Sequence, residues 1–167
     1  MKLTKTRKFR LEGLSEHEKY ILKQTRRQFR KCVNYFLHQT GKKGSTKKSD
    51  YNEEYRKAED KYILHSTLIY LARDFALKQY ETYKNDQNTS EFPHFDSLIG
   101  VPYDNNSLSI LSKENASGEL VVSLATTQEN VEATLKESEN KLKEFLETRS
   151  QQINLSRQDD EFFLSVE

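Results

Sequence analysis

The sequence of 167 residues contains one cysteine, two prolines and no tryptophan. A lone Cys32 excludes an internal disulfide framework and a cysteine-based zinc ribbon within this chain. Long hydrophobic runs are missing too: the longest uncharged stretch in the middle of the chain, residues 62–72, has 11 residues. A membrane-spanning helix needs about 20. The start of the chain has no apolar segment of a secretory signal. We therefore expect no membrane partner and a cytoplasmic location.

Sequence motifs of common catalytic sites are also absent. The chain has no Walker loop, no G-x-G-x-x-G, no G-x-S-x-G and no H-E-x-x-H. Its histidines are scattered without metal-ligand spacing: His17, His38, His65 and His94. The acidic residues fall on predicted solvated helix faces or in turns, and none ends a strongly apolar strand, where two-metal nucleases hold their carboxylates. We therefore expect no enzyme activity, no metal and no cofactor.

The charges nearly cancel over the whole chain but are divided unequally along it. Residues 1–61 carry 18 Lys and Arg against 8 Asp and Glu, a net charge of +10, whereas residues 62–167 carry 9 against 18, a net charge of −9. The basic half could bind a polyanion, or the two halves could attract each other across an interface. The tight clustering of 15 cations and 3 acids in residues 1–49 favours the polyanion.

The hydrophobic pattern predicts a folded α+β chain. Leu, Ile, Val and Phe supply 40 of 167 residues, above the roughly 20% associated with disorder. Ser15 and Glu18 form a capping box that opens a first helix, and Gly41 is expected to end it before a basic loop, residues 41–49. Further helices are predicted at 50–60, 61–84 and 129–149. Strands are predicted at 2–12, 98–103, 108–112, 120–126, 153–155 and 162–166.

The cations are interleaved with aromatic residues, a combination that binds phosphates and stacks on bases. The first helix presents one group of cations on its polar side: Lys23, Arg26, Arg27, Arg30 and Lys31. These charges repel one another unless an anion lies against them. The aromatic residues Phe29, Tyr35 and Phe36 are expected in the core instead, and so is Cys32.

The order of several segments resembles the N-terminal part of TnpB, the OrfB protein of insertion sequences, whose relatives are the compact type V CRISPR effectors. The resemblance covers nearly the whole chain. It rests on these segments in this order and spacing: KFRLEGLSEHE, RKCVNYFL, DKYILHSTLIYLARDFALKQYETY, FPHF, VPYDNNSLSI, GELVVSLATT and INLSRQDDEFFLSV. FPHF matches the family's F-P-x-F turn, including its distance from the preceding helix.

The resemblance implies a fold and a division of the chain. It implies a small OB-like β-barrel wedge, residues 1–12 and 93–167 with one inserted helix at about 129–149. A helical, helix-turn-helix-like recognition lobe, residues 13–92, interrupts this barrel. The family's RuvC-like nuclease domain begins just after this region, so this chain alone is expected not to cut DNA. A companion chain could supply the nuclease in trans and dock on the last strand, residues 162–166.

The resemblance also implies partners: a guide RNA and a target DNA, in a prokaryotic, nucleoid-associated setting. By position, Lys61 and His65, four apart on one helical face, match residues that contact the DNA motif beside the target, and Tyr51 lies near a third. The expected phosphate contacts are Lys5, Arg7, Lys8, Arg10, Lys23, Arg26, Arg27, Arg30, Lys42, Lys43, Lys47 and Lys48. The alternative is a small protein-interaction module whose basic half docks an acidic partner.

Overall fold

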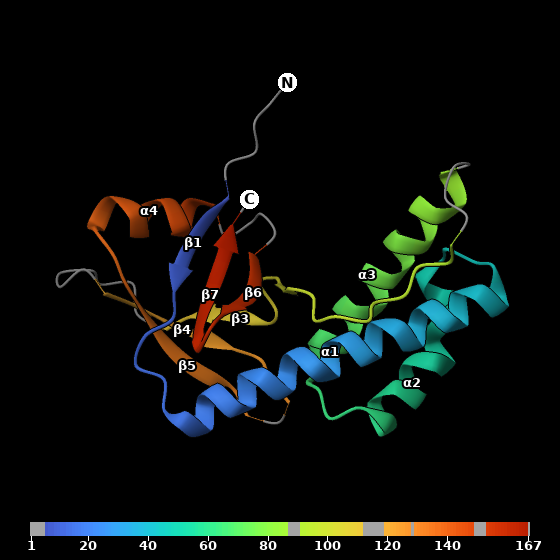
Figure 1. Cartoon of the computed structure of the whole chain (residues 1–167), viewed down its shortest axis with the longest axis horizontal. Coiled ribbons are helices and arrows are strands. Elements are labelled where there is room, and N and C mark those ends of the chain that lie inside the picture. Colours follow the sequence, from blue (N-terminus) through green and yellow to red (C-terminus); the bar gives the residue numbers. More distant parts are fainter. Residues whose placement is uncertain (1–5, 87–90, 112–118, 128, 149–152, 167) are drawn as a thin grey trace.

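The computed structural model of the chain describes residues 6–86, 91–111, 119–127, 129–148 and 153–166. In chain order the elements are β1 (Arg7–Arg10), α1 (Glu16–Lys43), the short 3-10 helix η1 (Lys48–Tyr51), α2 (Asn52–Lys61), α3 (Ser66–Asn85), β2 (Val101–Tyr103), β3 (Leu108–Ile110), β4 (Glu119–Leu124), β5 (Val131–Lys136), α4 (Glu139–Thr148), β6 (Ile153–Gln158) and β7 (Glu161–Val166). Within the described residues, two antiparallel sheets with the short helix α4 lie at one end of the molecule, α2 and α3 lie at the other, and the long helix α1 runs along both (Figure 1). The predicted α+β class is confirmed.

Helix α1 is the longest element, and it runs beneath the sheets before it continues along α2 and α3 (Figure 1). It begins with the predicted capping box, in which the Ser15 hydroxyl accepts from the Glu18 N–H at 3.1 Å and the Glu18 carboxylate accepts from the Ser15 N–H at 2.9 Å. Its buried stripe follows the spacing of an amphipathic helix: Leu22, Thr25, Phe29, Cys32, Val33, Phe36, Leu37 and Thr40. Arg26 is buried with them, at 9% exposed, so the expectation that it lies on the polar side of the helix is wrong.

The prediction that Gly41 ends α1 is wrong, because the helix continues to Lys43. Gly44 ends it in the left-handed conformation, at φ 67°, and donates its N–H to the Thr40 carbonyl at 2.8 Å. Gly41 has a different role: a Cβ there would lie 3.3 Å from the Phe92 ring, so a glycine lets that ring pack against the helix. A rule that considers only neighbouring residues cannot tell which of these two glycines, three positions apart, ends the helix.

The predicted helix 61–84 is also wrong at its start. Helix α2 ends at Lys61, Tyr62 is extended at φ −113° and ψ 133°, and α3 begins only at Ser66. His65 caps α3, since its Nδ1 accepts from the Thr67 N–H at 3.2 Å. Its own N–H donates to the Thr126 carbonyl at 2.8 Å, which ties the α2–α3 connection to the sheet region.

The strands form two separate sheets, with the orders β1-β7-β6-β2 and β3-β4-β5. An isolated antiparallel bridge joins Glu12 to Thr134, with N–H···O distances of 2.8 and 3.0 Å. The Tyr103 hydroxyl adds a hydrogen bond to the Ala125 carbonyl at 2.7 Å. The sheets are otherwise open, so the expected closed barrel is not formed. Strand β7 pairs on both sides, with β1 and with β6, so it is not the exposed edge that docking of a companion chain was expected to use.

The predicted helix 129–149 is two elements. Residues Val131–Lys136 form β5, which pairs with β4 along its whole length, and only Glu139–Thr148 form α4. Val131 and Leu135 are four apart, a spacing that suits one face of a helix and one face of a strand equally. Ala133 lies between them and is 3% exposed, which only the strand explains.

The core of the sheet region is completed by α4. Leu142 and Phe145 of this helix are fully buried, and the Phe145 ring packs edge-on against Phe9 of β1, with 5.1 Å between the ring centroids. No helix in the described part of the chain is both long enough and apolar enough to span a bilayer.

The strand assignment of residues 131–136 can be tested with one buried position. In a helix with Val131 and Leu135 on its buried side, position 133 would face solvent, and Ala133→Asp would be tolerated. In β5 the same substitution buries an unpaired carboxylate, so we expect the free energy of unfolding to fall by at least about 2 kcal/mol. Urea denaturation measures it. The exposed neighbour Glu132→Asp is the matched control and should change stability little; equal stability of both variants would contradict the strand.

Stability should also fall at high pH. Burial raises the pKa of both Cys32 and Tyr62 to about 12 in the folded protein, from ordinary values of 9.0 and 10.0. Above those ordinary values the unfolded chain therefore binds fewer protons than the folded one, and the free energy of unfolding decreases as the pH rises. We expect full stability below about pH 8.5 and a decline towards about pH 12. Tyr62→Phe should make the fall of stability with pH shallower. If the urea midpoints of this variant fall as steeply as those of the unmodified chain, ionisation of Tyr62 is not a cause of the fall.

Candidate nucleic-acid interface

A groove of about 630 Å³ lies between α1, the connection from α2 to α3, and the segment that contains His94. Cations, histidines and tyrosines dominate its walls, and none of the described residues that line it carries a carboxylate. The lining residues are Gln28, Arg30, Lys31, Asn34, Tyr35, His38, Lys61, Tyr62 and His94. The groove is therefore positive, polar at its rim and aromatic on one side.

One face of α1 supplies most of this lining. Lys31, Asn34, Tyr35 and His38 follow the spacing of three and four residues that places side chains above one another on a helix. This face is distinct from the buried stripe, so α1 can pack in the core and present these side chains at the same time. The groove wall is thus as rigid as the helix itself.

The opposite wall is held to α1 by hydrogen bonds. The Asn34 side chain donates to the Phe95 carbonyl at 2.8 Å and accepts from the Phe95 N–H at 2.9 Å. Arg30 Nη1 donates to the Asp96 carbonyl at 2.7 Å. The Phe95 ring contacts Phe75 of α3, with 5.6 Å between the centroids. The FPHF turn is therefore fixed against α1 and α3.

Lys61 lies over two tyrosine rings of the groove. Its Nζ atom is 5.2 Å from the Tyr35 ring centroid and 5.4 Å from that of Tyr62, and the two rings meet edge-on with 5.9 Å between centroids. Burial is the first cause that raises the pKa of each phenol, to about 12 for Tyr62. Both rings therefore stay neutral near pH 7 and add no negative charge to a site built from cations.

Four of the predicted phosphate contacts are instead paired with carboxylates. Arg7 pairs with Glu144 of α4, and Arg10 pairs with Glu12 at 2.7 Å and with Glu161 at 3.3 Å. Lys43 and Lys48 pair with Glu54 at 2.7 Å and with Asp74 at 3.2 Å. In the sequence analysis, attraction between the basic and the acidic half was the alternative to binding a polyanion. These ion pairs show that carboxylates of the same chain balance part of the clustered positive charge.

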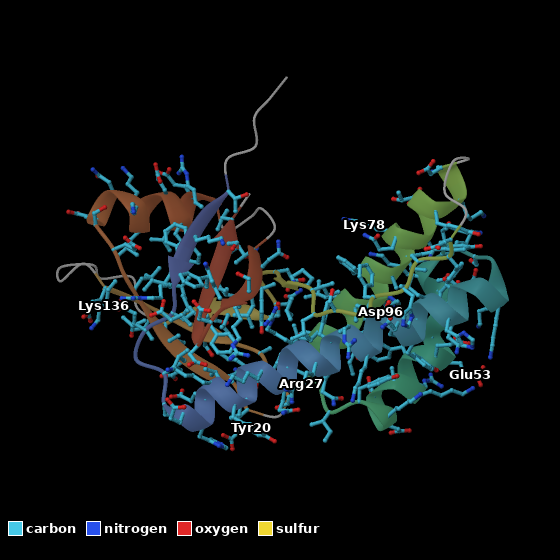
Figure 2. All side chains as sticks on the ribbon, in the orientation of Figure 1. Tyr20, Arg27, Glu53, Lys78, Asp96 and Lys136 are labelled. Carbon is cyan, nitrogen blue, oxygen red and sulfur yellow. The ribbon has the colours of Figure 1, made fainter. Side chains whose placement is uncertain are left out.

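The remaining predicted contacts have no ion pair with the carboxylates that the structure describes: Lys8, Lys23, Arg26, Arg27, Arg30, Lys42 and Lys47. Lys5 lies outside the described residues. Arg27 is exposed near the middle of α1 (Figure 2). The cations without a carboxylate are thus concentrated on α1 and just beyond its end, with Lys8 on β1.

The three residues expected to contact a DNA motif do not share one face. Lys61 ends α2 and His65 caps α3, so the expectation that they lie four apart on one helix is wrong, because the backbone between them is extended. Lys61 lines the groove, whereas the His65 ring is engaged with Thr67 at 2.8 Å. Tyr51 is fully buried, and its hydroxyl donates to the Ser45 carbonyl, so it cannot contact DNA as expected.

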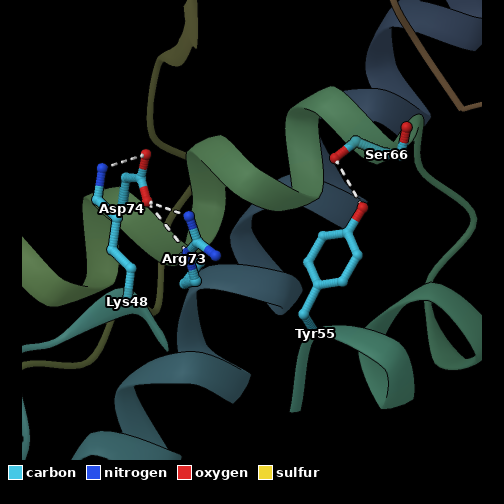
Figure 3. A network of polar contacts seen from close by, with 5 residues as sticks. All are labelled: Lys48, Tyr55, Ser66, Arg73 and Asp74. Atoms are coloured by element: carbon cyan, nitrogen blue, oxygen red, sulfur yellow. Dashed lines mark hydrogen bonds and ion pairs between the residues drawn. The ribbon is translucent and has the colours of Figure 1, made fainter. Parts of the chain in front are cut away.

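A polar network fixes α3 against η1 and α2 (Figure 3). Asp74 accepts from Lys48 at 3.2 Å and from Arg73 at 3.0 and 3.1 Å, and the Tyr55 hydroxyl reaches the Ser66 carbonyl at 3.5 Å. The Tyr55 ring also stacks on Tyr70, with 4.1 Å between the centroids. Lys48 therefore already has a carboxylate partner within the helical region.

Sequence reasoning missed several lining residues, above all Asn34, Tyr62 and His94, and it expected Tyr35 in the core, whereas this half-buried ring lines the groove. A signal was present for α1, since Lys31, Asn34, Tyr35 and His38 form a polar and aromatic stripe beside the apolar one. No local pattern shows that the FPHF turn closes over this stripe. No protein-family model matches the chain, and no curated protein matches it either.

Proposed function

We propose that this chain binds nucleic acid, with single-stranded RNA as the ligand of the groove. The observation that carries the proposal is the groove itself, in which Arg30, Lys31 and Lys61 surround two tyrosine rings without a carboxylate. Cations neutralise backbone phosphates, and aromatic rings stack on bases.

A single strand fits this groove better than a duplex does. Bases can stack on side chains only where they are unpaired, as in loops and single strands. The volume of about 630 Å³ lies within the roughly 300–1,000 Å³ of pockets that enclose drug-sized ligands, which leaves room for one or two nucleotides. His38 and His94 at the rim add hydrogen-bond donors or acceptors for base edges or the ribose 2′-hydroxyl.

The biological role that we propose is that of the N-terminal region of a TnpB-like protein. In this role α1, α2 and α3 form the recognition lobe, α2 and α3 are its helix-turn-helix-like pair, and the two sheets with α4 form the OB-like wedge. The guide RNA occupies the groove, where Lys61, the residue that the resemblance assigned to the DNA motif, contacts an RNA phosphate instead. In this role the chain described here cuts no DNA by itself.

Reversal of one groove charge should weaken binding. We expect Lys61→Glu to raise the Kd for a short single-stranded RNA about ten-fold or more, because it removes a phosphate contact and introduces repulsion beside Tyr35 and Tyr62. Fluorescence anisotropy at low salt measures the Kd. Arg56→Glu, an exposed change on the same helix at a residue that does not line the groove, is the matched control. Equal Kd values for the two variants would indicate that the RNA binds another surface of the protein.

The dependence of binding on salt should report the same contacts. Each phosphate neutralised on a single strand contributes about 0.7 to the slope of log affinity against log salt. The double variant Lys31→Ala/Lys61→Ala should therefore flatten the slope by about 1.4. Lys136 and Lys141 are exposed and already paired with Glu119 and Glu137, so the double variant K136A/K141A should keep the slope of the unmodified chain.

The same experiments separate RNA from an acidic protein partner. A protein that purifies without RNA, and that binds neither single-stranded RNA nor single-stranded DNA at low salt, would overturn the proposal. The interaction module would then be the better hypothesis, since an acidic peptide also suits a groove lined by cations.

A further inference from the structure

The groove contains two histidines, one on each of its walls. His38 belongs to the exposed face of α1, and His94 belongs to the FPHF turn on the opposite wall. Both residues are exposed, and the His94 side chain is 62% accessible to solvent. A ligand that enters the groove can therefore reach both imidazole rings.

The contacts of neighbouring residues hold the two histidines in one place. Phe95, directly after His94, exchanges two hydrogen bonds with the Asn34 side chain, at 2.8 and 2.9 Å. His38 lies one turn after Asn34 on the same face of α1. The two walls are thus joined within one helical turn of His38, and both rings line the same cavity of about 630 Å³.

The side chains that line the groove beside these rings carry positive charge or none. Three cations, Arg30, Lys31 and Lys61, lie in the lining. One ion pair in the described part of the chain involves a histidine, between His94 Nε2 and Asp96 Oδ1 at 3.4 Å, and the Asp96 side chain is 95% exposed.

The other charged groups nearby come from α1 and α2, and most are already paired. Lys42 lies one turn after His38 on α1. On the α2 side, Glu53, Glu54 and Lys57 interact with Tyr35. Glu53 pairs with Lys57 at 3.3 Å, and Glu54 pairs with Lys43 at 2.7 Å. These carboxylates therefore leave the groove itself positive.

The charge of an imidazole ring ordinarily changes between about pH 5 and 8. A neutral ring offers one hydrogen-bond donor and one acceptor, whereas a protonated ring offers two donors and a positive charge. A phosphate between the walls favours the protonated form, because opposite charges attract. The cations of Lys and Arg stay constant over the same pH range.

We infer that His38 and His94 bind backbone phosphate in their protonated form, so that the groove takes up protons with RNA and holds it more tightly as the pH falls. The inference rests on the proposed function and deepens it, since there the two rings serve only base edges or the ribose. It makes the affinity of the groove adjustable by acidity.

A pH series of RNA binding tests the inference. A short oligouridine is the probe, because neither its bases nor its phosphodiesters change charge in the pH range of the histidines. We expect the Kd, measured by fluorescence anisotropy at constant low salt, to fall about ten-fold between about pH 7.5 and about pH 5.5. The slope of log affinity against log salt should steepen by about 1.4, or about 0.7 for each added phosphate contact.

Substitutions separate these two rings from the general rise in positive charge at low pH. His38→Gln/His94→Gln cannot gain a proton, so its Kd should differ by less than about two-fold between the two pH values. His38→Lys/His94→Lys is charged throughout and should bind near pH 7.5 about as tightly as the unmodified chain does near pH 5.5. His17→Gln, an exposed change in the first turn of α1 outside the groove, is the matched control and should keep the full change of Kd with pH.

The possible failures of the inference and of the proposed function are distinct. RNA that binds with equal Kd at the two pH values would overturn the inference and leave the groove as the RNA site. A fall in Kd that persists in the double glutamine variant would overturn it as well. A chain that binds no RNA at either pH would overturn the proposed function, and the inference with it.

Discussion

The rest of this structure depends on the continuous burial of one stripe of α1. The helix is 28 residues long, and its fully buried positions extend from Leu22, near its start, to Thr40, near its end. A stripe of this length cannot be covered by the sheets or by α2 and α3 alone, so both regions pack on the same helix (Figure 1). The α2–α3 connection, joined to the sheet region through His65 and Thr126, reinforces this arrangement. Residues that α1 presents on its other faces thus have a fixed place relative to β6, to Lys61 and to the FPHF turn.

The pairing of Asn34 with Phe95 shows how the groove becomes defined. An extended segment beside a helix leaves peptide groups that need partners, and the side-chain amide of Asn34 satisfies both the N–H and the carbonyl of Phe95. Because Gly41 has no side chain, the Phe92 ring can pack closely against α1 at this position. The same ring contacts the rings of Tyr80 and Tyr83. The turn is therefore held by aromatic packing at one end and by hydrogen bonds at the other. The groove lies between these anchors and the cations of α1.

The sequence predicted those features that local chemistry decides. The capping box of Ser15 and Glu18, the buried stripe of α1 and the β6–β7 hairpin all follow from residues close together in the chain. Predictions were wrong where two local interpretations suit the same residues: Val131 and Leu135 fit a strand or a helix, and Gly41 resembles the helix-ending glycine three positions later. The break between Lys61 and His65 was missed because the apolar spacing continues across it. The groove could not be predicted from neighbouring residues, because it depends on a contact between Asn34 and Phe95, which are 61 positions apart in the sequence.

The distribution of ion pairs explains why charge collects at the middle of the molecule. Arg7 and Arg10 of β1 meet acids on α4 and β7, and Lys43 and Lys48 meet acids on α2 and α3, so carboxylates pair with some of the cations at both ends. Between these ends, α1 presents Arg26, Arg27, Arg30 and Lys31 to no described carboxylate. Attraction between the two halves and binding of an outside polyanion were set against each other as explanations of the charge distribution. Neither explanation has to account for all the cations of the chain. The first operates where basic and acidic elements meet, whereas the cations at the centre of α1 have no such partner among the described residues, and burial of Arg26 makes an uncompensated charge most costly there.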